Sequence, residues 1–207
     1  VSSEEKVEFQ TDNRNSAITH DTTNLSVLDE PITEVAEEIE LNIADNPTMV
    51  SKNKSISNKV RAKEDINYSE QQTISQKIGD RGEELVLRNE IEKTKEWGLP
   101  NETLSKVRRV SLESDDYGFD ILSFDQEGNE RYLEVKTTKT NGKNFSFILT
   151  RNEFETAKYY GKMYSFVIVF DILSNPRIWY MGNPFVEEPY KVKIQPTQYR
   201  VDIKTTE

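Results

Sequence analysis

The stretch Tyr117–Thr138, YGFDILSFDQEGNERYLEVKTT, contains two apolar segments separated by a polar turn. The turn, Asp125–Asn129, predicts a β-hairpin, because Asp, Gly and Asn favour tight reversals between strands. Side chains of a strand alternate between the two faces of a sheet, so Glu134 and Lys136 share one face. The hairpin brings Asp120 of the first segment beside that face. We therefore expect two carboxylates and a lysine to converge on an otherwise apolar sheet.

This cluster has two interpretations. A carboxylate buried on a strand is costly unless it is paired, protonated or bound to a metal ion. Two carboxylates with water suit Mg²⁺ or Mn²⁺, and an ammonium group beside such an ion can orient a water and stabilise charge on a phosphoryl group, as phosphodiester hydrolysis requires. On spacing alone, the simpler interpretation is that Glu134 and Lys136 lie on the wet face of a strand and Asp120 at a turn or edge.

Composition divides the chain near residue 70. Of the 9 Phe, 9 Tyr and 2 Trp residues, only Phe9 and Tyr68 lie within residues 1–78, which also contain no glycine. We expect residues 1–70 to form a disordered acidic arm, because their few apolar groups cannot offset the entropy lost on ordering. Residues 71–207 have a usual size for one domain with its own core.

Two pieces of the arm have an alternative interpretation. Pro31–Ile43 is either part of the disordered linker or a short amphipathic docking helix with Ile32, Val35 and Ile39 on one side. Residues 52–63 carry five basic and no acidic side chains. Such a run is usually a solvated linker, with phosphate contact as the alternative.

Composition also excludes several classes of function. The chain has no cysteine, and its one histidine, His20, lies in the arm, so thiolate zinc sites and histidine-based catalysis are excluded for the domain. The formal net charge is −10, of which residues 79–207 carry −3, so the domain lacks the basic surplus of a nonspecific nucleic-acid binder. The sequence shows neither a membrane span nor a signal peptide, and we expect a cytoplasmic protein.

The domain pattern predicts an α/β fold with a mixed sheet. A helix is expected over Gln72–Trp97, and its Gly79 and Gly82 suggest close approach to another element. A second helix is expected over Arg151–Tyr160, where Thr150 and Glu153 have the spacing of a capping box. The expected strands are Lys106–Leu112, Tyr117–Phe124, Arg131–Thr138, Phe145–Thr150, a doubly buried Met163–Ile172, and shorter edge strands at Arg177–Met181 and Tyr190–Ile194.

Over about residues 77–182, the order of motifs resembles the PD-(D/E)xK nuclease superfamily, and more narrowly the uncharacterised carboxyl-terminal domain of NO VEIN-type proteins. The motifs are Gly79-x-x-Gly82-Glu83-x-x-Val86, Gly118-Phe119-Asp120-Ile121, Tyr132-Leu133-Glu134-Val135-Lys136-Thr137-Thr138 and Asn152-Glu153. The E-V-K match alone is weak, and Phe119 stands where the superfamily has its proline. The resemblance implies a restriction-endonuclease-like mixed central sheet flanked by helices.

The resemblance also implies roles for individual residues. Asp120 and Glu134 would bind Mg²⁺ or Mn²⁺, and Lys136 would position the attacking water. Glu83 would reach from the helix to a metal-bound water or a second metal ion. Glu83 is preferred over Glu84 because it lies nearer the packed side of the helix, and Asn152-Glu153 is read mainly as a helix cap. The basic residues that could contact phosphates near the cleft are Arg108, Arg109, Lys139, Lys143 and Arg151.

We therefore predict a magnesium-dependent nuclease, acting on DNA, that serves as the effector domain of a larger bacterial defence or restriction protein. RNA is an alternative substrate that the sequence does not separate from DNA. A different class of function is a non-catalytic interaction module that keeps the nuclease-like fold and uses residues 1–70 to dock partners. Other domains or subunits are expected partners in either case, and a homodimer is compatible with the residues.

Overall fold

The computed structural model describes residues 25–41, 68–141 and 146–186, together with residues 192 and 194. The predictions for residues 52–63, for Lys143 and for most of the strand at Tyr190–Ile194 lie outside the described residues. No helix among the described residues is long and apolar enough to cross a membrane.

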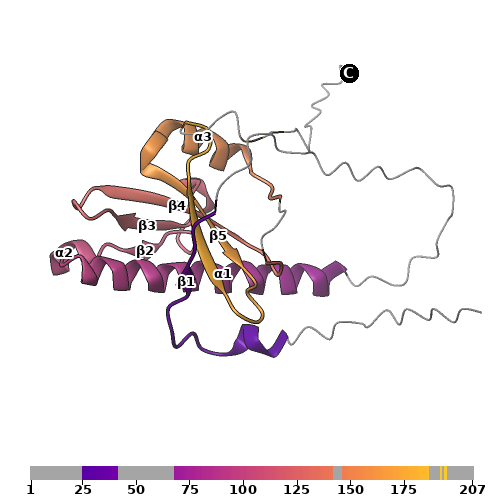
Figure 1. Ribbon diagram of the computed structural model, residues 1–207. Coiled ribbons are helices and arrows are strands. Elements are labelled where there is room, and N and C mark those ends of the chain that lie inside the picture. Colours follow the sequence, from indigo (N-terminus) through magenta and orange to yellow (C-terminus); the bar gives the residue numbers. More distant parts are fainter. Residues whose placement is uncertain (1–24, 42–67, 142–145, 187–191, 193, 195–207) are drawn as a thin grey trace, which may run out of the picture.

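The described elements follow one another as in the expected α/β pattern (Figure 1). The helices are α1 (Tyr68–Glu96), α2 (Asn101–Leu104) and α3 (Arg151–Tyr160), with 3₁₀ turns η1 (Leu25–Asp29), η2 (Asp115–Tyr117) and η3 (Gly161–Met163). The strands are β1 (Glu37–Glu38), β2 (Arg108–Arg109), β3 (Ile121–Phe124), β4 (Glu130–Thr137), β5 (Tyr164–Phe170) and β6 (Arg177–Gly182).

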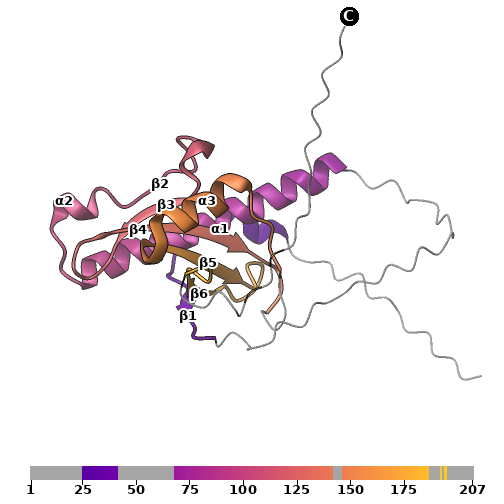
Figure 2. The same cartoon turned by 90° about the horizontal axis from the view of Figure 1, so that it is seen from above.

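The sheet lies between two helices, and Figures 1 and 2 show α1 along one face and α3 on the other. Within the described residues, its six strands are ordered β1-β6-β5-β4-β3-β2. The β4–β5 and β1–β6 pairs are parallel and the others antiparallel, so the predicted mixed sheet is confirmed. All seven residues of β5 are buried, as its apolar sequence predicted.

Alternation along the strands divides the apolar core between the two faces. Leu133 and Val135 of β4 pack with Ile78, Leu85 and Val86 of α1. On the other face, Tyr164 and Phe166 of β5 pack with Ala157 of α3. That core is completed by Val110, Phe119, Leu122, Ile168, Phe170 and Trp179. The side chains of Glu134 and Lys136 therefore belong to the α3 face, where their alternation with Leu133 and Val135 places them.

Two local predictions follow from side-chain chemistry and are confirmed. In the β3–β4 turn, Asp125 Oδ1 accepts hydrogen bonds from the N–H groups of Glu127 and Asn129, and Gly128 adopts a φ of 85°, which favours glycine. At the start of α3, the Thr150 hydroxyl accepts from the Glu153 N–H while the Glu153 carboxylate accepts from the Thr150 N–H. These bonds form the predicted capping box.

Three expected strands differ from the structure. Residues 146–150, expected to be a strand, have no regular secondary structure. The expected strand at 106–112 is reduced to the two residues of β2, and the residues before β3 form the turn η2. The expected edge strand at 177–181 is β6, which is an inner strand because β1 pairs along its outer side. Apolar alternation predicts that a segment is extended but does not reveal its neighbours.

The largest correction concerns the arm. Residues 25–41 were expected to belong to a disordered segment, yet they lie along α1 and the edge of the sheet. The alternative helix at Pro31–Ile43 is also wrong for its described part, which is extended and contains β1. Ile32 packs against the α1 face of the core and Ile39 against the other face, whereas Val35 is 51% exposed. The side chains of this segment contact both faces of the sheet because the extended chain passes around the edge of the sheet.

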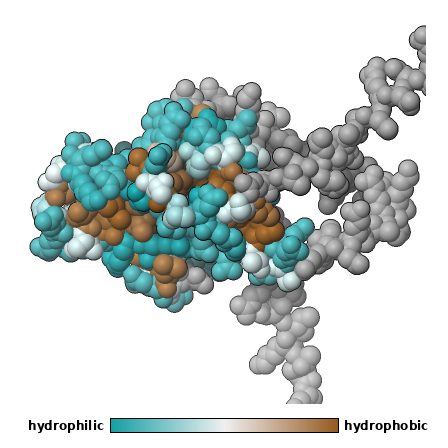
Figure 3. All heavy atoms as spheres, turned by 90° about the horizontal axis from the view of Figure 1, so that it is seen from below, coloured by the Kyte–Doolittle hydropathy of each residue, from teal (hydrophilic) through white to brown (hydrophobic). Residues whose placement is uncertain are grey.

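The surface of the described residues is mostly polar. Figure 3 shows one face, on which hydrophilic residues dominate and hydrophobic residues form separate patches between them. Most exposed large apolar side chains are well separated along the chain, for example Leu112, Ile148 and Tyr159. Scattered apolar residues of this kind are normal on a folded domain.

Candidate functional site

The β3–β4 register places Asp120 beside Glu134. Ile121 pairs with Leu133, so the next step of this antiparallel register sets Asp120 opposite Glu134. The backbone N–H of Asp120 donates to the Leu133 carbonyl (2.9 Å), and Asp120 Oδ2 accepts from the Val135 N–H (2.7 Å). The carboxyl group of Asp120 is thus fixed to the backbone of the strand that carries the E-V-K motif.

Lys136 joins two carboxylates from different elements. Its ammonium nitrogen lies 2.6 Å from Glu134 Oε1 and 3.2 Å from Glu153 Oε2 of α3. Glu134 is only 3% exposed, and its Oε2 lies 3.5 Å from the hydroxyl of Tyr164, which donates more closely to the Gly118 carbonyl (3.0 Å). This burial shows that Glu134 is not on a wet strand face, so the simpler interpretation of the E-V-K motif is wrong for Glu134.

Burial and like charge disfavour ionised carboxylates here. Burial, with the charge of Glu83 as a further cause, raises the pKa of Asp120 from 3.8 to about 7. Burial and then the charge of Asp120 raise the pKa of Glu134 well above its usual range. Burial opposes the charged form of Lys136, but the charges of Glu134 and Glu153 outweigh it and raise the lysine pKa. Ionising Asp120, Glu134 and Glu153 together would therefore place more negative charge here than Lys136 neutralises.

Glu83 enters from the other side of the sheet within a second ion-pair cluster. Its Oε2 accepts hydrogen bonds from Arg109 Nε (2.6 Å) and from the hydroxyl of Ser111 (2.5 Å). Arg109 also binds Asp80, one helical turn earlier. The charge of Glu83 helps to raise the pKa of Asp120, so the Asp120 carboxyl interacts electrostatically with both ion-pair clusters. Glu84 is exposed, in agreement with the choice of Glu83.

Gly82 allows α1 to approach the sheet at this point. A Cβ built on Gly82 would lie 1.9 Å from Thr137 Oγ1, so no larger residue fits without a shift. Gly79 has open space at the same position, and the expected close approach is wrong for that residue. The contact between Gly82 and the end of β4 sets the distance from α1 to the strand that carries Glu134 and Lys136.

The basic residues expected to contact phosphates differ in their exposure and in their ion pairs. Arg109 is partly buried and bound to two carboxylates, so its guanidinium is not presented to a ligand. Arg108 is exposed and pairs with Glu113 at 2.9 Å. Lys139 is exposed shortly after the end of β4, and Arg151 is exposed at the start of α3. The fifth, Lys143, lies outside the described residues.

The donors present fit a divalent cation that prefers oxygen ligands. Asp120 is a partly buried and Glu134 a buried carboxylate, both with raised pKa values, and the structure gives Asp120 Oδ1 no hydrogen-bond donor among the described residues. In the described part of the chain, no three acidic or histidine side chains are already arranged as metal ligands. Lys136 is paired with Glu134, and Arg109 with Glu83. A cation would have to be held first by Asp120 and Glu134.

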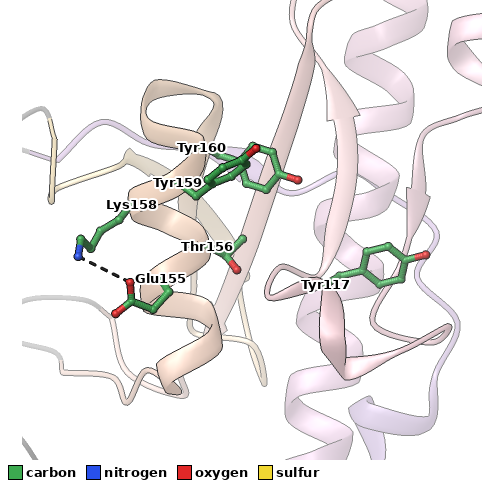
Figure 4. A pocket seen from close by; sticks show the side chains of 6 residues that line it. All are labelled: Tyr117, Glu155, Thr156, Lys158, Tyr159 and Tyr160. Atoms are coloured by element: carbon green, nitrogen blue, oxygen red, sulfur yellow. Dashed lines mark ion pairs between the residues drawn. The ribbon is translucent and has the colours of Figure 1, made fainter.

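A shallow hollow opens beside the site, between α3 and η2 (Figure 4). Its volume is about 570 Å³, and Figure 4 shows Tyr117 on one side, with Tyr159 and Tyr160 of α3 on the other. Thr156 approaches Gly118 here, because a Cβ on that glycine would lie 2.3 Å from Thr156 Oγ1. The remaining lining residues are Glu155 and Lys158. The hollow thus adjoins the segment that leads into Asp120.

Several residues of the site were not predicted from the sequence. Glu153 was read mainly as a cap, but the same Oε2 atom that completes the cap also binds Lys136. The Asn152-Glu153 motif was the sequence feature that could have indicated this second role of Glu153. Tyr164 and Ser111 had no such signal, because each reaches the site through contacts between segments far apart in the sequence.

Comparison with known proteins supports the narrower resemblance. Residues 82–181 match the model of the family described as "Protein NO VEIN, C-terminal". The matched residues include Glu83, Asp120, Glu134 and Lys136, and this family description names one end of a larger protein. No curated protein and no solved structure matches the chain.

Proposed function

We propose that this domain is a metal-dependent endonuclease that hydrolyses DNA phosphodiester bonds, as the effector domain of a bacterial defence or restriction protein. The observation that carries the proposal is the cluster of Asp120, Glu134 and Lys136, in which Glu134 is buried and the other two are partly buried. Two carboxylates with raised pKa values lie beside a lysine that other carboxylates keep charged. Such perturbed groups are more frequent at functional sites than elsewhere in proteins.

The topology supports the same proposal. A helix precedes an antiparallel hairpin, a second helix follows, and β5 then pairs in parallel with β4. This order is that expected of a restriction-endonuclease-like fold with a PD-(D/E)xK site. The match of residues 82–181 to the NO VEIN-type family covers these elements apart from the start of α1. It also includes β6 except for the last residue of that strand.

Each residue of the site would have its own role in the reaction. Asp120 and Glu134 would hold Mg²⁺, with Glu83 contributing from α1, and the bound ion would supply Lewis acidity and a more acidic water. Lys136, kept protonated by Glu134 and Glu153, would orient the attacking water and counter charge on the phosphoryl group. The Val135 N–H would hold the Asp120 carboxylate in position through Oδ2.

Substrate contacts are supported by the tyrosines of the hollow. Aromatic rings can stack on bases that are not paired, and such contacts tolerate any sequence. Arg108, Lys139 and Arg151 are exposed cations that can bind phosphates. DNA is the proposed substrate, and RNA is the alternative outcome of the same assay.

The test is the Mg²⁺-dependent conversion of supercoiled plasmid to nicked or linear DNA. We expect Asp120→Asn and Lys136→Met each to lower the rate about 100-fold or more, because each removes a group that stabilises the transition state. Lys95→Ala is the matched control, since this exposed lysine lies near the carboxyl-terminal end of α1 and, among the described residues, pairs with Glu92 alone. Equal rates in wild type and both site variants would contradict the proposal.

An interaction module with a nuclease-like fold is the alternative. The ion pairs of Lys136 and Arg109 favour it, because they already neutralise part of the acidic cluster without a metal ion. The absence of Mg²⁺ or Mn²⁺ uptake in calorimetry would support this alternative over the enzyme.

A further inference from the structure

The segment of residues 25–41 is bound to the domain in the manner of a peptide ligand. It carries six acidic residues and no basic one, and residues 42–67 connect it to α1. Figure 1 shows it running along α1 and across the sheet edge. The surface that receives it, formed by α1 and β6, is called here the α1–β6 groove.

Most polar anchors of the segment are directed at its backbone. Asn89 accepts from the Ala36 N–H and donates to the Ala36 carbonyl, both at 2.9 Å. Arg88 donates to the carbonyls of Ile32 and Thr33 at 2.7 Å, and Arg81 donates to that of Glu30 at 2.6 Å. Backbone recognition of this kind requires an extended chain but not a particular sequence.

Strand pairing continues the same interaction. Residues Glu37 and Glu38 form β1, which adds in parallel to β6, and the Ile39 N–H donates to the Ile178 carbonyl at 2.8 Å. An added strand of two residues is short, so the remaining anchors must supply most of the binding. This is the geometry of a peptide that extends a sheet at its open edge.

Apolar side chains give the groove its selectivity. Leu28, Ile32 and Ala36 recur every four residues and pack against the core on the α1 side, while Ile39 packs on the opposite side of the sheet. Val35 points away and is 51% exposed. A ligand of the groove therefore needs apolar residues at these four positions and accepts polar ones between them.

Charge complementarity adds to the fit. Lys77 pairs with Asp29 at 2.6 Å at one end of the segment, and Lys93 pairs with Glu38 at 2.7 Å at the other. Between them, Arg81 and Arg88 bind backbone carbonyls. Four cations of α1 thus line the path of an acidic chain, and salt screens such partly exposed pairs.

We propose that the α1–β6 groove is a peptide-binding site for extended acidic segments, and that residues 25–41 are its ligand, able to dissociate and exchange. The occupant is this segment of the same copy, which the structure shows in place. The groove lies at the opposite edge of the sheet from β2, and its use does not depend on nuclease activity.

The experiment uses the full chain with a specific protease site placed between residues 42 and 67. After cleavage, the amino-terminal fragment is expected to co-elute with the domain in gel filtration. A fluorescent peptide of residues 25–41, added in excess, is expected to replace it, with binding measured by anisotropy. Raising NaCl from about 50 to 500 mM is expected to weaken binding several-fold.

Paired substitutions test the mode of binding. The peptide with Ile32→Ser is expected to bind at least 10-fold more weakly, while the peptide with Val35→Ser binds within about twofold of the parent, because only Ile32 enters the core. Arg88→Ala in the domain is expected to weaken binding at least 10-fold. Equal binding by the two variant peptides would overturn the proposal. So would a fragment that the peptide cannot replace, or a domain that unfolds whenever the fragment leaves, since the segment would then be an integral part of the fold.

Discussion

Asp120 Oδ2 accepts a 2.7 Å hydrogen bond from the backbone N–H of Val135, so the carboxyl group that immediately precedes β3 is fixed to β4 between Glu134 and Lys136. This bond favours the ionised form of Asp120 and so opposes part of the rise in its pKa that burial causes. The same bond survives replacement by asparagine, whose carbonyl oxygen can accept it. Asp120→Asn is therefore the variant that removes charge with least disturbance of structure.

The raised pKa of Asp120 predicts a pH dependence of stability in EDTA. Between about pH 4 and 7, the folded protein holds a proton on Asp120 that the unfolded chain has lost, so this group's contribution to stability is lost as pH rises through that window. Asp120→Asn removes this effect. We expect the free energy of unfolding of the variant, relative to wild type, to rise by up to about 4 kcal/mol from pH 4 to 8.

Urea denaturation at several pH values measures this difference. The raised pKa of Glu134 acts in the same direction. Its larger cause, burial, remains in the variant, but the charge of Asp120 is removed, so the Glu134 shift becomes smaller in the variant and adds to the same difference. A difference between wild type and variant that is the same at pH 4 and pH 8 would contradict the assigned environment of Asp120.

Two glycines of α1 predict opposite effects on stability. Gly82→Ala places a Cβ 1.9 Å from Thr137 Oγ1, and such overpacking costs roughly 1–3 kcal/mol. Gly79→Ala meets nothing within 4 Å and should stabilise the helix by up to about 1 kcal/mol. Chemical denaturation of both variants tests this, and equal destabilisation by the two would show that α1 does not approach β4 at Gly82.

Glu153 is predicted to act on Lys136 separately from its role as a cap. Glu153→Gln keeps an acceptor for the Thr150 N–H but removes the charge that helps to raise the Lys136 pKa. If the domain is a nuclease, the alkaline limb of its pH–rate profile should move to lower pH in this variant. Thr150→Ala is the control, expected to cost about 1 kcal/mol of stability without moving the profile. Equal shifts in both variants would assign Glu153 to capping alone.

Local features of the fold were predictable because their causes lie within a few residues. The β3–β4 turn depends on Asp125 and Gly128, and the start of α3 depends on Thr150 and Glu153. The face shared by Glu134 and Lys136 follows from strand alternation alone. These features were sufficient to place Asp120 beside the E-V-K motif.

Features that depend on distant contacts were not predictable in the same way. The segment 25–41 is held by contacts with Asn89 and Ile178, which are remote in the chain and leave no signal within the segment's own sequence. Its acidic composition therefore suggested disorder. Similarly, Arg109 was predicted to contact phosphate from its charge alone, whereas in the structure it pairs with Asp80 and Glu83 of α1.

Titration of the apoprotein with Mn²⁺ in a calorimeter measures whether Asp120 and Glu134 bind a metal ion together, as the proposed catalytic site requires. We expect wild type to bind Mn²⁺ with saturation, Asp120→Asn and Glu134→Gln to lose that binding, and the exposed control Lys95→Ala to retain it. Absence of binding by wild type, or unchanged binding by the two site variants, would contradict the account.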